Sequence, residues 1–228
     1  MVLEFSDTEN AAVPAATSIL VRQSEQGVET LLLRRSEALQ NMPGLWVFPG
    51  GKVDPEDAGS DEERCAGAAA VRELQEEAGL AVEASALVAF SHWLTPPVVK
   101  RRFSTWFFLT SAPTSQTVQV DGEEMVEHRW LAPAAAIAEH HAGRLPLTPP
   151  TLVSLHELAL YESVDTLLQS IASRAPPRFF PKVLRQDDHM VFLYPGDAAY
   201  ETGDLSALGP VHRTLAREGI FQYFPQTH

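Results

Sequence analysis

The stretch "VRELQEEAGL", residues 71–80, places Glu73, Glu76 and Glu77 within five positions. At about 100° per residue, the three carboxylates fall on one face of a helix, and apolar side chains form the opposite face. Gly79 follows at the position where a left-handed residue ends a helix. Like charges at this spacing destabilise an isolated helix, and hard cations such as Mg²⁺ or Mn²⁺ prefer carboxylate oxygens. The stretch therefore indicates a divalent-cation site, with a solvated acidic helix face as the alternative.

The residues around this helix favour the cation site. Arg72 stands four positions before Glu76 and can pair with that carboxylate. Upstream, "FPGGK" (residues 48–52) forms a tight glycine turn that lets backbone carbonyls approach an ion or a phosphate. The order of a strand, a Gly-Gly loop, an acidic helix and a final glycine is more specific than a charge cluster alone.

The segment resembles the Nudix box, G-x5-E-x7-R-E-U-x-E-E-x-G-U, in which U is a bulky apolar residue. Gly51 stands at the first glycine, and "RELQEEAGL" (72–80) matches the second half. The resemblance implies an α/β fold with a Nudix-type mixed β-sheet sandwiched between α-helices. It also implies a hydrolase that cleaves a diphosphate linked to another group, with Mg²⁺ or Mn²⁺ as cofactor. Glu73, Glu76 and Glu77 would be metal ligands with the Gly51 carbonyl, and Arg72 would orient a carboxylate.

The first half of the box departs from the pattern. Asp57 stands where the box has its first glutamate, and residues 58–71 separate it from Arg72, where the box has seven residues. Counting back from Arg72 instead leads to Arg64, with Glu63 beside it. We therefore expect the loop to be about seven residues longer than usual, and we expect neither Asp57 nor Glu63 to act in the site.

The family often adds an acid from a later strand, and "DGEEMVEHRWL" (121–131) is the candidate segment. Glu124 is the expected metal ligand and Glu127 the reserve. Strand alternation puts them on opposite faces, so only one should reach the site; an exposed strand edge is the alternative. Glu76 is our first choice as the residue that binds metal and activates water, with Glu124 second.

A second, weaker resemblance concerns the substrate. Coenzyme-A-cleaving Nudix enzymes show L-L-T-x-R-[S/A]-x3-R-x3-G-x3-F-P-G-G before the box. Leu31, Leu32, Arg35, Ser36, Gly44 and residues 48–51 are in register, whereas Leu33 and Gln40 depart from the motif. This resemblance implies coenzyme A or acyl-coenzyme A as substrate. An ADP-ribose or nucleotide-sugar pyrophosphatase, and a non-catalytic Nudix-fold binding or regulatory module, remain alternatives. Arg35, Arg101 and Arg102 are candidate phosphate-binding residues, although Arg101 and Arg102 can equally be solvated strand ends.

Along the chain, residues 17–34 predict a β-hairpin around "SEQG". Further strands are expected at residues 45–48, 87–94, 101–110, 123–131, 189–194, 211–216 and 220–224, and helices at residues 65–78, 133–143, 152–161 and 163–173. His140 and His141 end the helix at 133–143, where positive charge suits the dipole. We expect a Nudix core at residues 1–145 and an α+β extension at 146–228 that packs on it.

Composition sets the remaining expectations. The 228 residues carry a formal net charge of −13, which disfavours nucleic acid and anionic membranes as partners. A small-molecule diphosphate is the expected partner, and a cation is expected to mediate its binding. The single cysteine, Cys65, fits a reducing cytoplasm. The acidic start "MVLEFSDTEN" lacks the pattern of a secretory signal. The sequence leaves the oligomeric state open, a homodimer included.

Overall fold

The computed structural model describes residues 10–226, so nearly all of the acidic start lies outside the described residues. The larger sheet comprises β1 (Val13–Ser24), β2 (Gly27–Arg35), β3 (Trp46–Val47), β4 (Gly50–Lys52), β5 (Val88–Leu94), β6 (Phe103–Ser111), β7 (Met125–Leu131) and β8 (Arg178–Phe179). Its order is β3-β2-β1-β6-β5-β8, with β4 paired to β1 and β7 to β2. The β1–β6 and β5–β8 pairs are parallel and the others antiparallel, so the predicted mixed sheet is confirmed.

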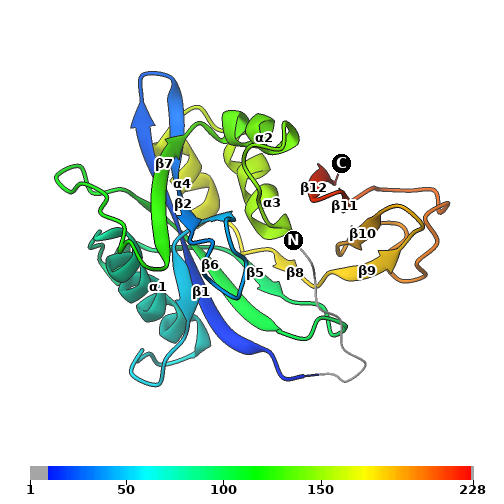
Figure 1. The fold of residues 1–228 in the computed structure, drawn as a ribbon, viewed down its shortest axis with the longest axis horizontal. Coiled ribbons are helices and arrows are strands. Elements are labelled where there is room, and N and C mark those ends of the chain that lie inside the picture. The colour runs from blue at the N-terminus through cyan, green and yellow to red at the C-terminus, as the bar shows by residue number, and fades with distance from the viewer. Residues whose placement is uncertain (1–9, 227–228) are drawn as a thin grey trace.

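Helices cover both faces of this sheet (Figure 1): α1 (Glu62–Ala78), α2 (Pro133–His141), α3 (Pro149–Leu158) and α4 (Val164–Ala172), with a 3₁₀ turn at Ala84–Ala86. Alternation along β1 divides the core. Leu20 packs with Leu74 of α1, whereas Ile19 packs in the cluster that contains Leu155 of α3 and Leu167 of α4. The expected sandwich of a sheet between helices is therefore confirmed.

The predicted acidic helix begins earlier than expected, at Glu62, because Asp61 caps it by accepting a hydrogen bond from the Arg64 N–H at 3.0 Å. It ends at Gly79 with φ of 66°, as predicted. The glycine turn before it differs from expectation, because Gly50–Lys52 forms strand β4 rather than only ending one. A Cβ on Gly50 would lie 2.3 Å from the Ala16 carbonyl oxygen, so glycine is required for this close pairing.

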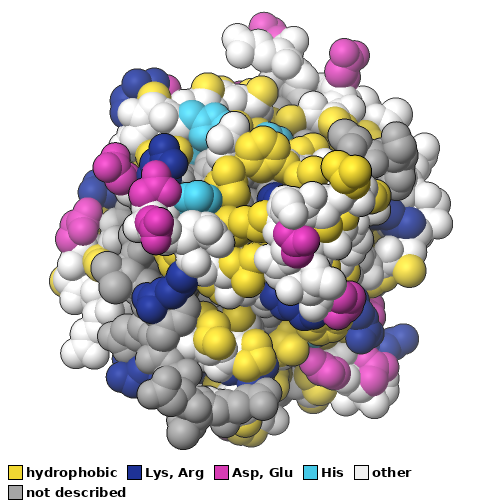
Figure 2. All heavy atoms as spheres, turned by 90° about the vertical axis from the view of Figure 1, so that its right-hand side faces the viewer, with side chains coloured by type: hydrophobic (Ala, Val, Ile, Leu, Met, Phe, Trp, Pro, Cys, Tyr) yellow, Lys and Arg dark blue, Asp and Glu magenta, His cyan; other side chains and the backbone are white. Residues whose placement is uncertain are grey.

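A second, antiparallel sheet follows, made of β9 (Lys182–Arg185), β10 (Met190–Leu193), β11 (Arg213–Arg217) and β12 (Ile220–Phe224). Figure 2 shows the face of the molecule on this side, where apolar side chains gather between charged ones. Strands β8 and β9 escaped prediction, because each is short and prolines flank β8.

The segment after residue 145 is built into the main core. β8 extends the edge of the larger sheet beside β5, and α3, α4, β10 and β12 contribute to the same hydrophobic cluster as β1 and β2. The division of the chain at residue 145 stays a prediction. In the described part of the chain, none of the helices combines the length and the apolar character that crossing a bilayer requires.

Candidate active site

Arg72 is the centre of the acidic cluster. Its guanidinium donates to Glu73 at 2.8 Å, to Glu76 at 3.1 Å and to the Lys52 carbonyl at 3.0 Å. The predicted pairing of Arg72 with Glu76 is thus present. These contacts join the glycine turn to two successive turns of α1 and fix the direction in which the carboxylates point.

Asp57, which the sequence analysis left out of the site, contacts Arg72. Its carboxylate accepts from Arg72 Nε at 3.1 Å and from Nη2 at 2.9 Å, a two-point contact. The hydrogen bonds from Arg72 lower the pKa of Asp57 and outweigh the effect of burial. The sequence analysis did not expect this contact between Asp57 and Arg72, and whether Asp57 acts in the site stays a prediction. Asp57 stands where the spacing from Gly51 puts the first acid of the box, and the exposed residues 58–61 connect it to α1.

Glu77 lies deeper than its neighbours, at 5% exposure, and accepts a 2.8 Å hydrogen bond from the Gly50 N–H. Burial raises the pKa of the Glu77 carboxyl to about 8; Glu73 and Glu124 add to the effect, and the Gly50 bond and Arg35 oppose it. Burial also raises the pKa of Glu73, although Arg72 offsets part of that shift. A cation bound beside these carboxyl groups would lower both pKa values and stabilise their ionised forms.

The donor set fits a hard divalent cation, because it consists of carboxylate oxygens beside a glycine backbone. Gly51 leaves space for the Glu73 carboxylate, because a Cβ at position 51 would lie 2.3 Å from a Glu73 carboxylate oxygen. Within residues 10–226, however, no three acidic, histidine or cysteine side chains already surround a common point as metal ligands. Glu73 and Glu76 are instead paired with Arg72, so their roles as metal ligands stay predictions.

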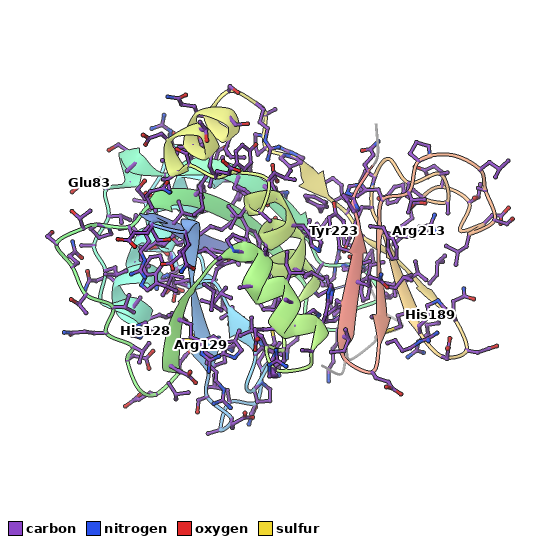
Figure 3. The ribbon with its side chains drawn as sticks, turned by 90° about the horizontal axis from the view of Figure 1, so that it is seen from above. Glu83, His128, Arg129, His189, Arg213 and Tyr223 are labelled. Atoms are coloured by element: carbon purple, nitrogen blue, oxygen red, sulfur yellow. The ribbon has the colours of Figure 1, made fainter. Side chains whose placement is uncertain are left out.

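A cavity of about 560 Å³ opens beside this cluster, and it is lined by Gly50, Gly51, Glu73, Glu77 and Glu124 among others. Glu124 precedes β7 and its carboxylate lies 3.9 Å from Arg35, which also lines the cavity. Glu127 does not line it; Glu127 pairs with Arg129 at 2.8 Å, in the part of β7 labelled in Figure 3. Of the two acids, Glu124 is the one that lines the cavity, and its role as a metal ligand stays a prediction.

The other two predicted phosphate-binding residues lie elsewhere. Arg102 is buried and donates to the Asn10 carbonyl at 2.6 Å and to the Thr95 carbonyl at 3.2 Å, so it holds backbone rather than facing the cavity. Arg101 is exposed and does not line the cavity either. The structure therefore contradicts the placement of both arginines in the site. Lys52, which the sequence analysis did not select, lines the cavity instead.

Comparisons with known proteins agree with this geometry. The chain is 29% identical over 187 residues to "Putative nudix hydrolase 7" of Caenorhabditis elegans, covering 66% of this chain and 62% of the relative. It is 29% identical over 129 residues to "Acyl-coenzyme A diphosphatase NUDT19" of Xenopus laevis, covering 53% and 34%. It is 32% identical to "m7GpppN-mRNA hydrolase NUDT17" of Bos taurus, covering 58% and 46%. The chain thus spans only about a third to three fifths of these relatives.

The fold has a solved counterpart. The structure of a NUDIX hydrolase from Alicyclobacillus acidocaldarius superposes with a TM-score of 0.67, covering 75% of this chain and 100% of that one at 21% identity. The family model described as "NUDIX domain" matches residues 12–149, which include the glycine turn, α1 and Glu124. The chain therefore belongs to the Nudix family.

Proposed function

We propose that the chain is a metal-dependent hydrolase of phosphoric anhydrides, which cleaves a diphosphate joined to a nucleoside and to a second group. The observation that carries this proposal is the Arg72 network, which holds the carboxylates of Asp57, Glu73 and Glu76 beside the Gly50–Gly51 turn at the mouth of a cavity. Carboxylates arranged in this way serve phosphoryl transfer through a cation better than they would bind an anionic substrate directly.

Glu73, Glu76, Glu77 and Glu124, with the Gly51 carbonyl, are the residues that would hold Mg²⁺ or Mn²⁺. When bound, such ions offset the diphosphate charge and lower the pKa of a water molecule. The side chains then divide the work. Arg72 keeps Glu73 and Glu76 oriented, Arg35 and Lys52 face the phosphates, and a carboxylate accepts the proton of the attacking water.

Glu76 is the first candidate for the proton acceptor. Its side chain is 59% exposed and bonds Arg72 at 3.1 Å, so it is both open to water and fixed in direction. Glu124 is the second candidate, because it also lines the cavity. Glu77 suits this role less, because its carboxylate is already engaged by the Gly50 N–H.

Coenzyme A or acyl-coenzyme A is our first choice of substrate, supported by Arg35 in the cavity wall and by the name of the Xenopus relative. ADP-ribose or a nucleotide sugar is the alternative within the same chemistry. Products discriminate between them: coenzyme A gives 3′,5′-ADP and a phosphopantetheine, whereas ADP-ribose gives AMP and ribose 5-phosphate.

The experiment is a panel of diphosphates incubated with the protein and Mg²⁺ or Mn²⁺, with released products separated by chromatography. Turnover that EDTA abolishes supports the proposal. A protein that binds a diphosphate tightly but releases no product under any metal would instead support a non-catalytic binding module.

A further inference from the structure

The cavity beside the acidic cluster extends sideways across the larger sheet. Thr17 of β1 is paired with Gly50 of β4 on one side and with Phe107 of β6 on the other. The next strand, β5, brings Trp93 opposite Thr105. Adjacent strands lie about 4.8 Å apart, so the floor runs roughly 14 Å from the glycine turn to β5. Side chains of all four strands line this one cavity.

The chemistry of the wall changes along this path. The charged side chains that line the cavity belong to its near half: Arg35, Lys52, Asp54, Glu73, Glu77 and Glu124. The part of the wall that β5, β6 and the chain after residue 147 contribute, here called the far half, is lined by Trp93, Leu94, Thr95, Pro96, Val99, Phe103, Thr105, Phe107, Thr148, Pro149, Pro150, Thr151, Pro181, Phe192 and Tyr194. Among these lining residues, which the structure describes in full, none carries a charge. We call this far half the apolar compartment.

The segment after residue 145 closes the apolar compartment. The first turn of α3 contributes Thr148 and Pro150, and β10 with the residue after it contributes Phe192 and Tyr194. Tyr194 is fully buried, so its ring supports the wall from within the core, and its hydroxyl donates to Thr214 at 2.8 Å. The wall is thus preformed, which favours binding because little side-chain entropy is lost.

A second contact holds the β5 side of the compartment. Trp93 stacks on Phe179 of β8, with ring centroids 4.0 Å apart and an angle of 4° between the rings. Tyr194 packs edge-on against Trp93 at 5.5 Å. The ring that lines the cavity is therefore fixed by residues that lie outside the segment matched by the family model.

We propose that the apolar compartment binds the uncharged, apolar part of the group joined to the diphosphate, and that residues 148–194 thereby set substrate choice. The proposal rests on the proposed function, because the near half must hold the diphosphate. A charged group in the far half would lose its hydration with no ionic partner in the wall, whereas an apolar chain gains from leaving water.

The test uses two non-hydrolysable probes, the octyl and the methyl ester of adenosine 5′-methylenediphosphonate, titrated calorimetrically in Mg²⁺. The octyl ester should bind at least about tenfold more tightly, because burial of about two methylene groups already gives that factor. Its binding should also show the more negative heat-capacity change. Equal affinity for the two esters overturns this inference alone, whereas failure of both to bind overturns the proposed function with it.

Variants locate the effect. Thr105→Phe fills the compartment from β6 and should bring the octyl-to-methyl affinity ratio close to one. Val126→Phe, at an exposed strand position outside the cavity, is the matched control and should keep the wild-type ratio. Pro150→Glu is the second probe, since an acidic residue is favourable in the first turn of α3 and keeps the fold. It should also lower the ratio. A wild-type ratio in a folded Thr105→Phe or Pro150→Glu protein places the apolar group elsewhere and refutes the inference.

Discussion

Asp57 and Arg72 meet through two hydrogen bonds of 2.9 and 3.1 Å, although 14 residues lie between them in the sequence. The Asp57 side chain is 6% exposed, and it is the most buried of the acids that Arg72 contacts. Arg72 can hold Glu73 and Glu76 only while its own position is fixed. We therefore expect Asp57 to act as a positioning residue for the acidic cluster.

The first prediction concerns this pair. Asp57→Asn should lower kcat about tenfold or more while KM for the diphosphate changes little, because a displaced Arg72 misorients groups that act on the reacting phosphorus. Glu63→Gln is the control, since Glu63 is exposed and lies on the first turn of α1. Steady-state kinetics measure both variants. Equal kinetics for the two would show that Arg72 keeps its place without Asp57.

The second prediction concerns the carboxylates of α1. Glu76→Gln should leave the melting temperature unchanged and lower kcat about a hundredfold or more, because it removes a ligand and a proton acceptor. Glu83→Gln, at an exposed position after the same helix (Figure 3), is the control. Near-normal turnover in Glu76→Gln, or full activity of the wild-type protein in excess EDTA, contradicts the metal site.

The third prediction concerns Arg35. If Arg35 contacts the 3′-phosphate of coenzyme A, removal of that phosphate from the substrate should lower kcat/KM by about 1.5–3 kcal/mol, as for a charge-assisted hydrogen bond. In Arg35→Met the two substrates should become nearly equivalent. Arg101→Met should keep the wild-type difference, because Arg101 does not line the cavity. If the wild-type protein hydrolyses ADP-ribose with a higher kcat/KM than coenzyme A, coenzyme A is refuted as the substrate and the family assignment is unaffected.

Much of the architecture followed from local patterns in the sequence. The helix at α1 was predictable because alanine content, apolar spacing and Gly79 all agree, and the central hairpin because a glycine turn separates two β-prone runs. The same local patterns place the predicted site residues of α1 and the glycine turn next to one another. Asp57 was missed because spacing assumes a fixed loop length, whereas a longer loop can return a carboxylate to the same guanidinium.

Residues whose neighbours are distant in sequence were the hardest to interpret. Arg102 appeared to be an available cation, yet the chain folds the Asn10 and Thr95 carbonyls onto it. The apolar compartment needs Trp93 and Tyr194 to meet, which no local periodicity indicates. His140 was interpreted as a positive charge that suits the dipole at a helix end, whereas it is fully buried.

The fourth prediction follows from that burial. His140 Nδ1 lies 3.0 Å from the Leu145 carbonyl and Nε2 accepts from the Phe221 N–H at 2.9 Å, so the neutral ring ties α2 to β12. Burial lowers the pKa of His140. The unfolded chain then binds more protons just below about pH 6.5, so stability should fall as the pH drops through that range. Urea unfolding at pH 7.5 and 5.5 measures the loss.

His140→Gln should reduce this pH dependence, because it removes the titrating ring. It should not abolish the dependence, since burial also lowers the pKa of His92, His156 and His212. His128→Gln is the control, because His128 is exposed on β7 (Figure 3). An unchanged pH dependence in His140→Gln would show that the ring can be protonated without loss of the Phe221 contact.

The fifth prediction compares two Asp–Arg pairs of the smaller sheet. Arg213 lies on β11, and Tyr223 lies on the other side of the sheet, toward α3 (Figure 3). The Asp197 side chain is 0% exposed and accepts 2.7 Å bonds from two nitrogens of Arg213. Burial raises the pKa of Asp197, but Arg213 and the N–H groups of His212 and Ala199 outweigh it, and the net pKa is lowered. Its contribution to stability is therefore present at neutral pH and lost as the pH falls below about 4.

Asp197→Asn should destabilise the protein by about 3 kcal/mol, because it leaves the largely buried Arg213 without its counter-charge. Asp188→Asn should leave the unfolding midpoint unchanged, because the Asp188–Arg217 pair is exposed to solvent on both sides. Since Tyr194 lines the apolar compartment and its hydroxyl bonds Thr214, next to Arg213, Asp197→Asn should also weaken the octyl ester more than the methyl ester. Chemical unfolding and calorimetry test the two effects separately, and equal midpoints for the two variants would contradict the role assigned to the buried pair.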